Sequence, residues 1–353
     1  MFSLFFLFSL FSPNILALDI IDNIKLSGYA TYTKSYGINN EFNFNEILDF
    51  GINLNYRINN NIYISLQPVS RSNKIQLDYG LISILINNNI DLMLGRIKIP
   101  YGFYNETRDV PFTRPSVLLP QSIYPNKLRD FALSSDGIML KYSNVINNYY
   151  NLGINIGVGY PLISDGYKIN FFPMNINEIK LESKLSKVLI INLDSIDLTK
   201  SLKYSYINSE SKSENNYTGL SFNTHVLSGQ YNFNDFRLTS EYSSSTADIK
   251  NGINSASQGL YFQIEYFLNS KFTLLSRYDI QRVQFDNDYI KDNNYHGWAF
   301  NVKYKLIDNL NLNLFYQSSL GTNPLIPVDI TTGNFFNHSN KWDLFMFSLD
   351  YKF

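Results

Sequence analysis

Charged side chains of both signs crowd into and beside one proline-rich segment of the chain, residues 100–135. The candidates for chemistry are Arg96, Lys98, Glu106, Arg108, Asp109, Arg114, Lys127, Arg129 and Asp130, with Asp136 just beyond them. Opposite charges held across a narrow water-filled opening create a transverse field, which selects solutes by charge and dipole. The same charges can instead pair with one another and pin the segment in place. The sequence supports both interpretations.

The proline-rich segment cannot form a regular strand. Five of the chain's eleven prolines lie in it, and proline cannot donate a hydrogen bond to a strand ladder. Irregular segments of this length are usually either functional or disordered. A disordered tail would contain fewer apolar side chains than this segment, which has Phe103, Tyr104, Phe112, Val117, Leu118, Leu119, Ile123, Tyr124 and Phe131. We therefore expect it to pack, either inside the structure built by the rest of the chain or across its mouth.

No pattern typical of an enzyme accompanies these charges. The chain has no cysteine, and its three histidines, His225, His296 and His338, lack the spacing of metal ligands. We find no nucleophile motif, and we predict no catalytic residue, no metal site and no cofactor. His225 alternates with Ser221 and Asn223 and is expected to line water. Lysine and arginine total 29 against 30 aspartates and glutamates, a balance that argues against a nucleic-acid partner.

The elements that must position these side chains are strands. Along the C-terminus, the residues that point one way are Phe345, Phe347, Leu349, Tyr351 and Phe353, and mostly polar residues alternate with them. A period of two with one apolar face describes a strand between two different solvents. The alternation recurs at residues 52–58, 62–67, 150–159, 262–268, 300–306 and 310–314. Short turns rich in asparagine and aspartate separate many runs, because these residues tolerate the left-handed conformation of tight hairpins.

Sixteen strands account for the pattern. We predict them at residues 24–36, 47–58, 61–70, 74–86, 90–99, 136–146, 149–160, 179–194, 197–208, 217–231, 235–247, 257–268, 271–285, 295–306, 310–320 and 341–353. Longer polar connections are expected at the ends opposite the short turns, at 36–46, 160–178, 243–256, 286–294 and 320–340. The continuously apolar run 188–193 hides the turn expected within 179–208, so fourteen or eighteen strands are alternatives.

The fold class that follows is all-β, a transmembrane antiparallel up-and-down β-barrel with a long in-folded loop. After the N-terminus, no stretch reaches the ~18 consecutive apolar residues of a spanning helix. The mean hydropathy of −0.16 is compatible with a barrel, because half of each strand faces water. The alternative is a soluble β-sandwich or propeller, in which the apolar faces would pack inward.

Strand parity predicts which side chains line the water-filled interior. The charged members of this lining are Arg57, Lys141, Arg237, Arg277, Lys303 and Lys305, with Glu241, Glu265, Asp279 and Asp350. Once Arg96 and Lys98 join them, the basic side is slightly favoured, which predicts a mild preference for anions. Strict alternation would put Arg96 and Lys98 in lipid, at ~2–4 kcal/mol each near the midplane. We expect a β-bulge near Gly95 to turn both inward; snorkelling above the membrane is the alternative.

The first seventeen residues, Met1 to Ala17, are apolar and look like a signal peptide for export. The predicted organisation is therefore a signal peptide at residues 1–17 and a barrel at residues 18–353. Within the barrel, residues 100–135 would be the constriction loop.

One stretch is similar to a known family. The run from Leu94 to Tyr124, LGRIKIPYGFYNETRDVPFTRPSVLLPQSIY, is followed by Asp136-Gly137 and resembles part of exported proteobacterial porins, near the general and phosphate-selective ones. The terminal Tyr351 and Phe353 resemble the signal by which the insertion machinery recognises outer-membrane barrels. The resemblance implies a 16-stranded barrel in the outer membrane of a Gram-negative bacterium, with the loop after the fifth strand folded into the lumen.

The resemblance also implies a function and partners. The expected function is a water-filled channel for passive diffusion of ions and small hydrophilic solutes. The expected partners are outer-membrane lipid and lipopolysaccharide, the barrel-insertion machinery and further copies of the chain in a homotrimer. Two alternatives are a substrate-specific channel for an anion, phosphate or oligosaccharide, and a plugged barrel with a structural or adhesive role.

Overall fold

A computed structural model describes residues 18–21, 23–38, 46–71, 74–126, 133–162, 181–213, 219–249, 253–286, 293–321 and 341–353. Its strands are β1 (Leu18–Ile21), β2 (Ile24–Ile38), β3 (Glu46–Arg57), β4 (Ile62–Arg71), β5 (Lys74–Asn87), β6 (Ile90–Lys98), β7 (Ser134–Ile146), β8 (Tyr150–Pro161), β9 (Leu181–Ser183), β10 (Ser186–Ser195), β11 (Lys200–Ser213), β12 (Gly219–Phe233), β13 (Phe236–Ile249), β14 (Ile253–Phe267), β15 (Phe272–Phe285), β16 (Asn293–Ile307), β17 (Leu310–Gly321) and β18 (Trp342–Lys352). One short 3₁₀ helix, η1 (Pro111–Thr113), lies between β6 and β7. In these ranges, no helix has the length and apolar character needed to cross a membrane.

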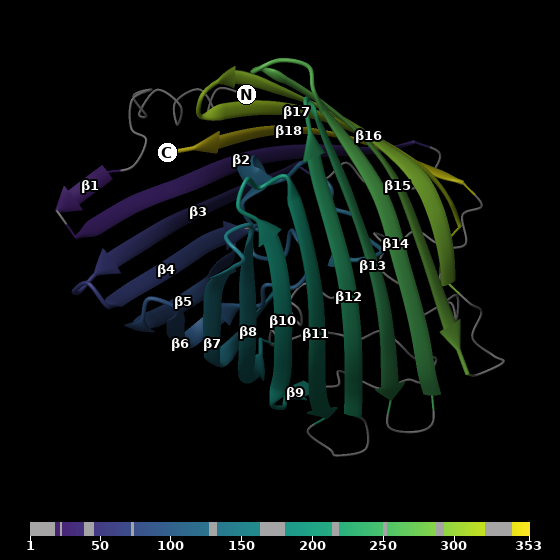
Figure 1. Cartoon of the computed structure of the whole chain (residues 1–353). Coiled ribbons are helices and arrows are strands. Elements are labelled where there is room, and N and C mark those ends of the chain that lie inside the picture. The colour runs from purple at the N-terminus through teal and green to yellow at the C-terminus, as the bar shows by residue number, and fades with distance from the viewer. Residues whose placement is uncertain are drawn as a thin grey trace.

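Sixteen strands close into an antiparallel barrel (Figure 1). Neighbours in the chain pair with each other, and β18 pairs with β2 to complete the ring, with Lys352 opposite Tyr29. The short β9 pairs with β11 in line with β10, so β9 and β10 together occupy one place in the wall. β1 is an extra strand paired with the start of β2. The predicted all-β barrel of sixteen strands is confirmed, and fourteen or eighteen strands are excluded.

The outer face of the barrel is apolar and the inner face is polar. Leu140, Phe262 and Phe300 point outward and are 41%, 58% and 48% exposed. Ser228 and Asn313 point inward and are almost completely buried. An apolar outer surface of this extent is unfavourable in water and favourable in lipid. The prediction that the apolar faces point outward is confirmed.

The turn that the sequence analysis could not place lies at residues 196–199. The apolar run 188–193 therefore lies wholly within β10, where Leu189 and Ile191 point outward. Val188 and Ile190 point inward and are only 5% and 0% exposed, because other apolar side chains cover them. β10 is therefore apolar on both faces, which removes the alternation that would have revealed its end.

Two predictions fail where strands rise above the apolar belt. The connection expected at 243–256 is shorter, since β13 runs to Ile249 and β14 begins at Ile253. His225 was expected to line water inside, but it lies on the outer face, with Nδ1 2.8 Å from the hydroxyl of Tyr204 and its ring beside Tyr206. Its neighbour Val226 packs inside the barrel.

The ends of these long strands also have polar residues on the outer face. Their polar character is typical of a loop or of an inward face, which explains why both the 243–256 connection and the orientation of His225 were predicted wrongly. Most of the other long connections predicted lie outside the described residues.

The last residue of the chain is part of the barrel's closure. The backbones of Phe353 and Gly28 exchange two hydrogen bonds, of 2.8 and 3.0 Å, beyond the end of β18. A Cβ atom at Gly28 would lie 2.4 Å from the ring of Phe353 and 2.6 Å from the carbonyl oxygen of Gly51. Glycine at position 28 therefore makes room for the terminal aromatic ring against β2.

We predict that Gly28→Val weakens this closure. The added side chain would displace the Phe353 ring and a backbone carbonyl, so we expect a loss of about 1–3 kcal/mol of stability. Urea unfolding of the refolded barrel would measure it. Ala30→Val, one outward position further along β2, is the matched control. Equal stability of the two variants would contradict the role assigned to Gly28.

Candidate functional site

Residues 99–126, here called the inner segment, run through the interior of the barrel between β6 and β7. The segment is coloured blue in Figure 1. Its side chains are mostly buried: Tyr101, Asn105 and Tyr124 are 3%, 0% and 0% exposed. Bonds from the inner segment reach the wall at β4, β11, β13, β15 and β16, far apart around the ring. The segment therefore crosses the lumen and does not cover its mouth.

Glu241 on β13 holds the inner segment at two points. Its side chain is completely buried and accepts hydrogen bonds from the hydroxyls of Tyr124, at 2.7 Å, and Tyr261, also at 2.7 Å. Ser228 donates at 2.8 Å, and the backbone N–H of Phe103 donates at 3.3 Å. A buried carboxylate is costly unless such donors surround it. Because Phe103 and Tyr124 are 21 positions apart, one carboxylate ties the start of the segment to its end.

A second anchor is formed by neighbouring charges on β15. Arg277, 0% exposed, donates to the carbonyl oxygen of Leu118 at 3.0 Å and to the hydroxyl of Ser116 at 3.2 Å. Asp279 accepts from the backbone N–H of Gln121 at 3.0 Å and from the hydroxyl of Tyr295 at 2.8 Å. Residues 116–121 are therefore fixed through the backbone of Leu118 and Gln121 and the hydroxyl of Ser116.

The third anchor lies on the opposite wall and involves Asp109 of the inner segment. Its carboxylate lies 2.9 Å from Nη2 of Arg71 on β4 and 3.8 Å from Nζ of Lys98 on β6. Arg71 also approaches Asp78, at 3.6 Å. Lys98 reaches inward from the end of β6 and donates to the carbonyl oxygen of Glu106 at 3.2 Å. These charges hold the segment to β4 and β6.

The remaining predicted constriction residues have several roles. Arg108 stabilises the inner segment from within, by donating to the carbonyl oxygens of Tyr124 and Pro125 at 3.0 and 2.9 Å. Arg114 accepts, through its carbonyl oxygen, a hydrogen bond from Lys303 on β16. Glu106 is exposed, so its carboxylate is accessible to solutes. The predicted Lys127, Arg129 and Asp130 lie outside the described residues.

Arg96 does not lie in the lumen, and the bulge predicted at Gly95 does not exist. β6 pairs with β7 in unbroken register there, with Gly95 opposite Gly137 and Arg96 opposite Asp136. Arg96 points outward, on the face opposite that of Ile97, which packs inside. Its guanidinium donates to both carboxylate oxygens of Asp136, at 2.8 and 3.0 Å. This bidentate pair lowers the cost of placing an arginine on the outer face. The predicted change of register is therefore not needed to accommodate Arg96.

The predicted lining residues all belong to strands of the wall, but their exposure differs. Glu241, Glu265 and Arg277 are 0–3% exposed and are covered. Arg57 is exposed. The described residues that the sequence analysis did not single out include Tyr261 and Tyr295, whose hydroxyls complete the two wall anchors. No sequence signal marks them, because tyrosine is frequent in strands generally.

Apolar contacts add to the polar anchors. Ile123 and Tyr124 belong to a buried cluster with Ile190 and Val226 of the wall. Across the lumen, a second cluster joins Leu118 of the inner segment to these wall side chains: Ala299, Phe315, Trp342 and Leu344. Apolar residues at inward positions of a barrel strand would face water without such a cover. They are a signal, readable in the sequence, for where an in-folded segment lies.

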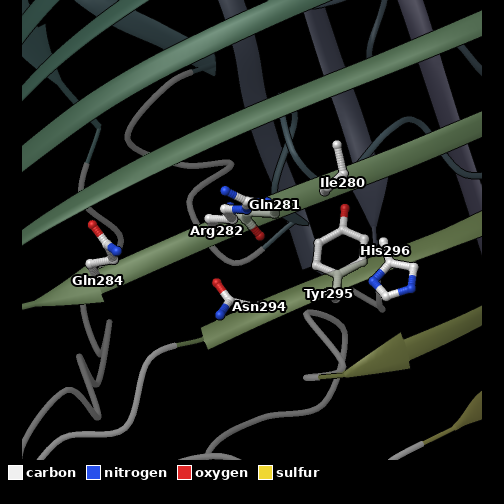
Figure 2. Close-up of a pocket in the computed structure, with 7 residues that line it drawn as sticks. All are labelled: Ile280, Gln281, Arg282, Gln284, Asn294, Tyr295 and His296. Carbon is white, nitrogen blue, oxygen red and sulfur yellow. The ribbon is translucent and has the colours of Figure 1, made fainter.

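A cavity of about 390 Å³ opens beside β15 and β16, next to Tyr295 of the second anchor (Figure 2). Ile280, Arg282 and His296 line it together with polar neighbours. These three alternate with the inward-facing Asp279 and Tyr295, so this part of the cavity belongs to the outer face. Gln281 and Tyr295, which point inward, also line the cavity, so residues of both faces of the wall border it.

Comparison with solved structures places the fold among outer-membrane porins. OmpF of Salmonella typhi, in complex with daunomycin, has a TM-score of 0.66 and 12% identity, over 96% of this chain and 100% of that chain. OmpT of Vibrio cholerae in its trimer form has a TM-score of 0.65 and 12% identity, over 94% of this chain and 99% of that chain. An anion-selective porin from Comamonas acidovorans has a TM-score of 0.61 and 10% identity, over 94% and 99% of the two chains. At such identities the likeness shows the shared fold alone. No protein-family model and no curated protein sequence matches the chain.

We predict that Glu241→Gln loosens the inner segment. An amide presents its own N–H groups to the four donors around Glu241, which leaves buried donors unpaired at about 1–3 kcal/mol. The midpoint of urea unfolding should fall accordingly. Glu210→Gln is the control, because Glu210 is 44% exposed and pairs only loosely with Lys184. Unchanged stability of Glu241→Gln would show that the carboxylate is not an anchor.

Proposed function

We propose that this chain is an outer-membrane channel through which ions and small hydrophilic solutes diffuse passively. The observation that carries the proposal is the inner segment, held across a polar lumen by Glu241, Arg277 and Asp109. A polar interior inside an apolar exterior provides a water-filled path through lipid. A segment fixed at several points of the wall would narrow that path to a constant size, which limits the solutes that pass.

We further propose the cellular setting. Residues 1–17 would direct export, and the barrel would reside in the outer membrane of a Gram-negative bacterium, with lipid and lipopolysaccharide around it. Tyr351 and Phe353 would be recognised by the insertion machinery. Assembly as a homotrimer has the support that one similar structure is described as a trimer form. No enzymatic activity is proposed; among the described residues, no three potential metal ligands cluster.

A plugged barrel, with an adhesive or structural role, is the second candidate. The observation in its favour is the burial of inward side chains along half of the wall: Ser228, Gln263, Asn313 and Ser348 are 0–3% exposed. These side chains are therefore covered by protein and do not line an open passage. The two candidates therefore differ in whether the remainder of the lumen stays open.

Single-channel recording of the refolded protein in a planar bilayer separates them. We expect steady current steps, because the inner segment is fixed and does not flicker between positions. A barrel shown to be folded by its β-sheet circular dichroism, yet without current steps, would contradict the channel and support the plug.

A further inference from the structure

Basic side chains gather on one sector of the inner wall, on the side of the short turns. The basic sector, as we call it, consists of Lys25 on β2, Arg57 on β3, Lys303 and Lys305 on β16, and Lys352 on β18. β16, β17, β18, β2 and β3 are consecutive neighbours in the ring. Because the chain's net charge is −1, this excess of positive charge is a local feature.

Contacts of the inner segment show that the sector faces inward. Lys303 donates to the carbonyl oxygen of Arg114, and Nζ of Lys352 lies 4.4 Å from the ring centre of Phe112. Lys25 shares its face of β2 with Tyr29, which is buried inside at 1% exposure. The basic sector therefore lies directly beside the edge of the segment that narrows the lumen.

The carboxylates near the basic sector either are buried beside Lys303, as Asp350 and Glu265 are, or lie at the rim, as Asp308 does. Asp350, the inward carboxylate of β18, is 1% exposed and already accepts from Asn313 at 2.7 Å. Lys305 pairs with Asp308 at the rim, at 2.7 Å. Among the residues that the structure describes, the other four members form no ion pair: Lys25, Arg57, Lys303 and Lys352. Lys303 and Lys352 are occupied by the inner segment, whereas Lys25 and Arg57 are exposed, so the charge of these two is available to solutes in the lumen.

The opposite sector, β6 to β11, has a different balance. Its inward carboxylates are Asp91 on β6 and Asp194 on β10. The exposed Glu106 of the inner segment also lies beside β6, where its carbonyl oxygen accepts from Lys98. Lys141 and Lys203 offset them, and Lys98 of β6 pairs with Asp109. One side of the lumen is therefore basic and the other is mixed, which gives a field across the passage.

We infer that the channel prefers small anions, such as phosphate or carboxylate solutes, and that the basic sector guides them past the inner segment. The inference rests on the proposed channel function and adds the charge class of the solute and the residues that select it. Anions are concentrated along a surface of unpaired cationic side chains, and cations are depleted there. Arg57 and Lys25 matter most for entry from the turn side, because both are exposed.

Reversal potentials in a potassium chloride gradient test the inference. We expect the wild-type channel to pass chloride more readily than potassium, and more so at 0.1 M than at 1 M salt, since salt screens the sector. Lys25→Gln and Arg57→Gln should each lower the chloride-to-potassium permeability ratio about two- to threefold. Arg57→Glu should lower it further. Arg282→Gln is the matched control, since it removes an exposed arginine from the outer face.

The possible outcomes distinguish a failure of the anion preference from a failure of the channel function. Current steps with potassium preference, or with a permeability ratio that the Lys25 and Arg57 variants leave unchanged, would overturn the inference and keep the channel. A folded barrel without current steps would overturn the channel itself, and the inference with it. Both substituted side chains are exposed and free of contacts with the inner segment, so unchanged urea unfolding is expected for these variants.

Discussion

The structure depends on a buried carboxylate that has hydrogen-bond donors around it and, among the residues that the structure describes, no cation at salt-bridge distance. Glu241 is enclosed by Tyr124, Tyr261, Ser228 and the backbone of Phe103, so its charge is stabilised only while the inner segment is in place. Withdrawal of the segment would take away two of the four donors. In an interior of low polarity such a loss is expensive, and the wall and the segment therefore stabilise each other.

Other parts of the wall hold the inner segment in the same way, through buried polar contacts. Arg277 and Asp279 bind backbone groups of the segment on one side, and Arg71 binds Asp109 on the other. Apolar side chains fill the spaces between these polar anchors. The charged residues predicted either to select solutes or to pin the segment fall into two groups. Asp109 and Arg108 pin it, whereas the exposed Glu106 and Arg57 remain available to water.

Much of the fold could be predicted from the sequence, because two solvents impose a period of two on every strand. Left-handed asparagines such as Asn147 and Asn234 occupy the short turns, as their residue type suggests. The errors arise where that simple rule has an exception. β10 is apolar on both faces because the inner segment covers one of them, and His225 lies outside because its strand rises above the lipid. Arg96 remains outward because Asp136 neutralises it across the strand pair. The path of the inner segment depends on contacts between residues more than a hundred positions apart, which no local pattern encodes.

The central claim is that the inner segment covers one part of the wall and leaves another in contact with water. Thiol accessibility tests it directly, because the chain contains no native cysteine. Ser205, 0% exposed, lies against the backbone of Gly102, whereas Ser65 on β4 is partly exposed. A small charged thiol reagent should modify Ser65→Cys readily and leave Ser205→Cys unmodified in the folded barrel. Equal rates of modification at the two positions would contradict the account.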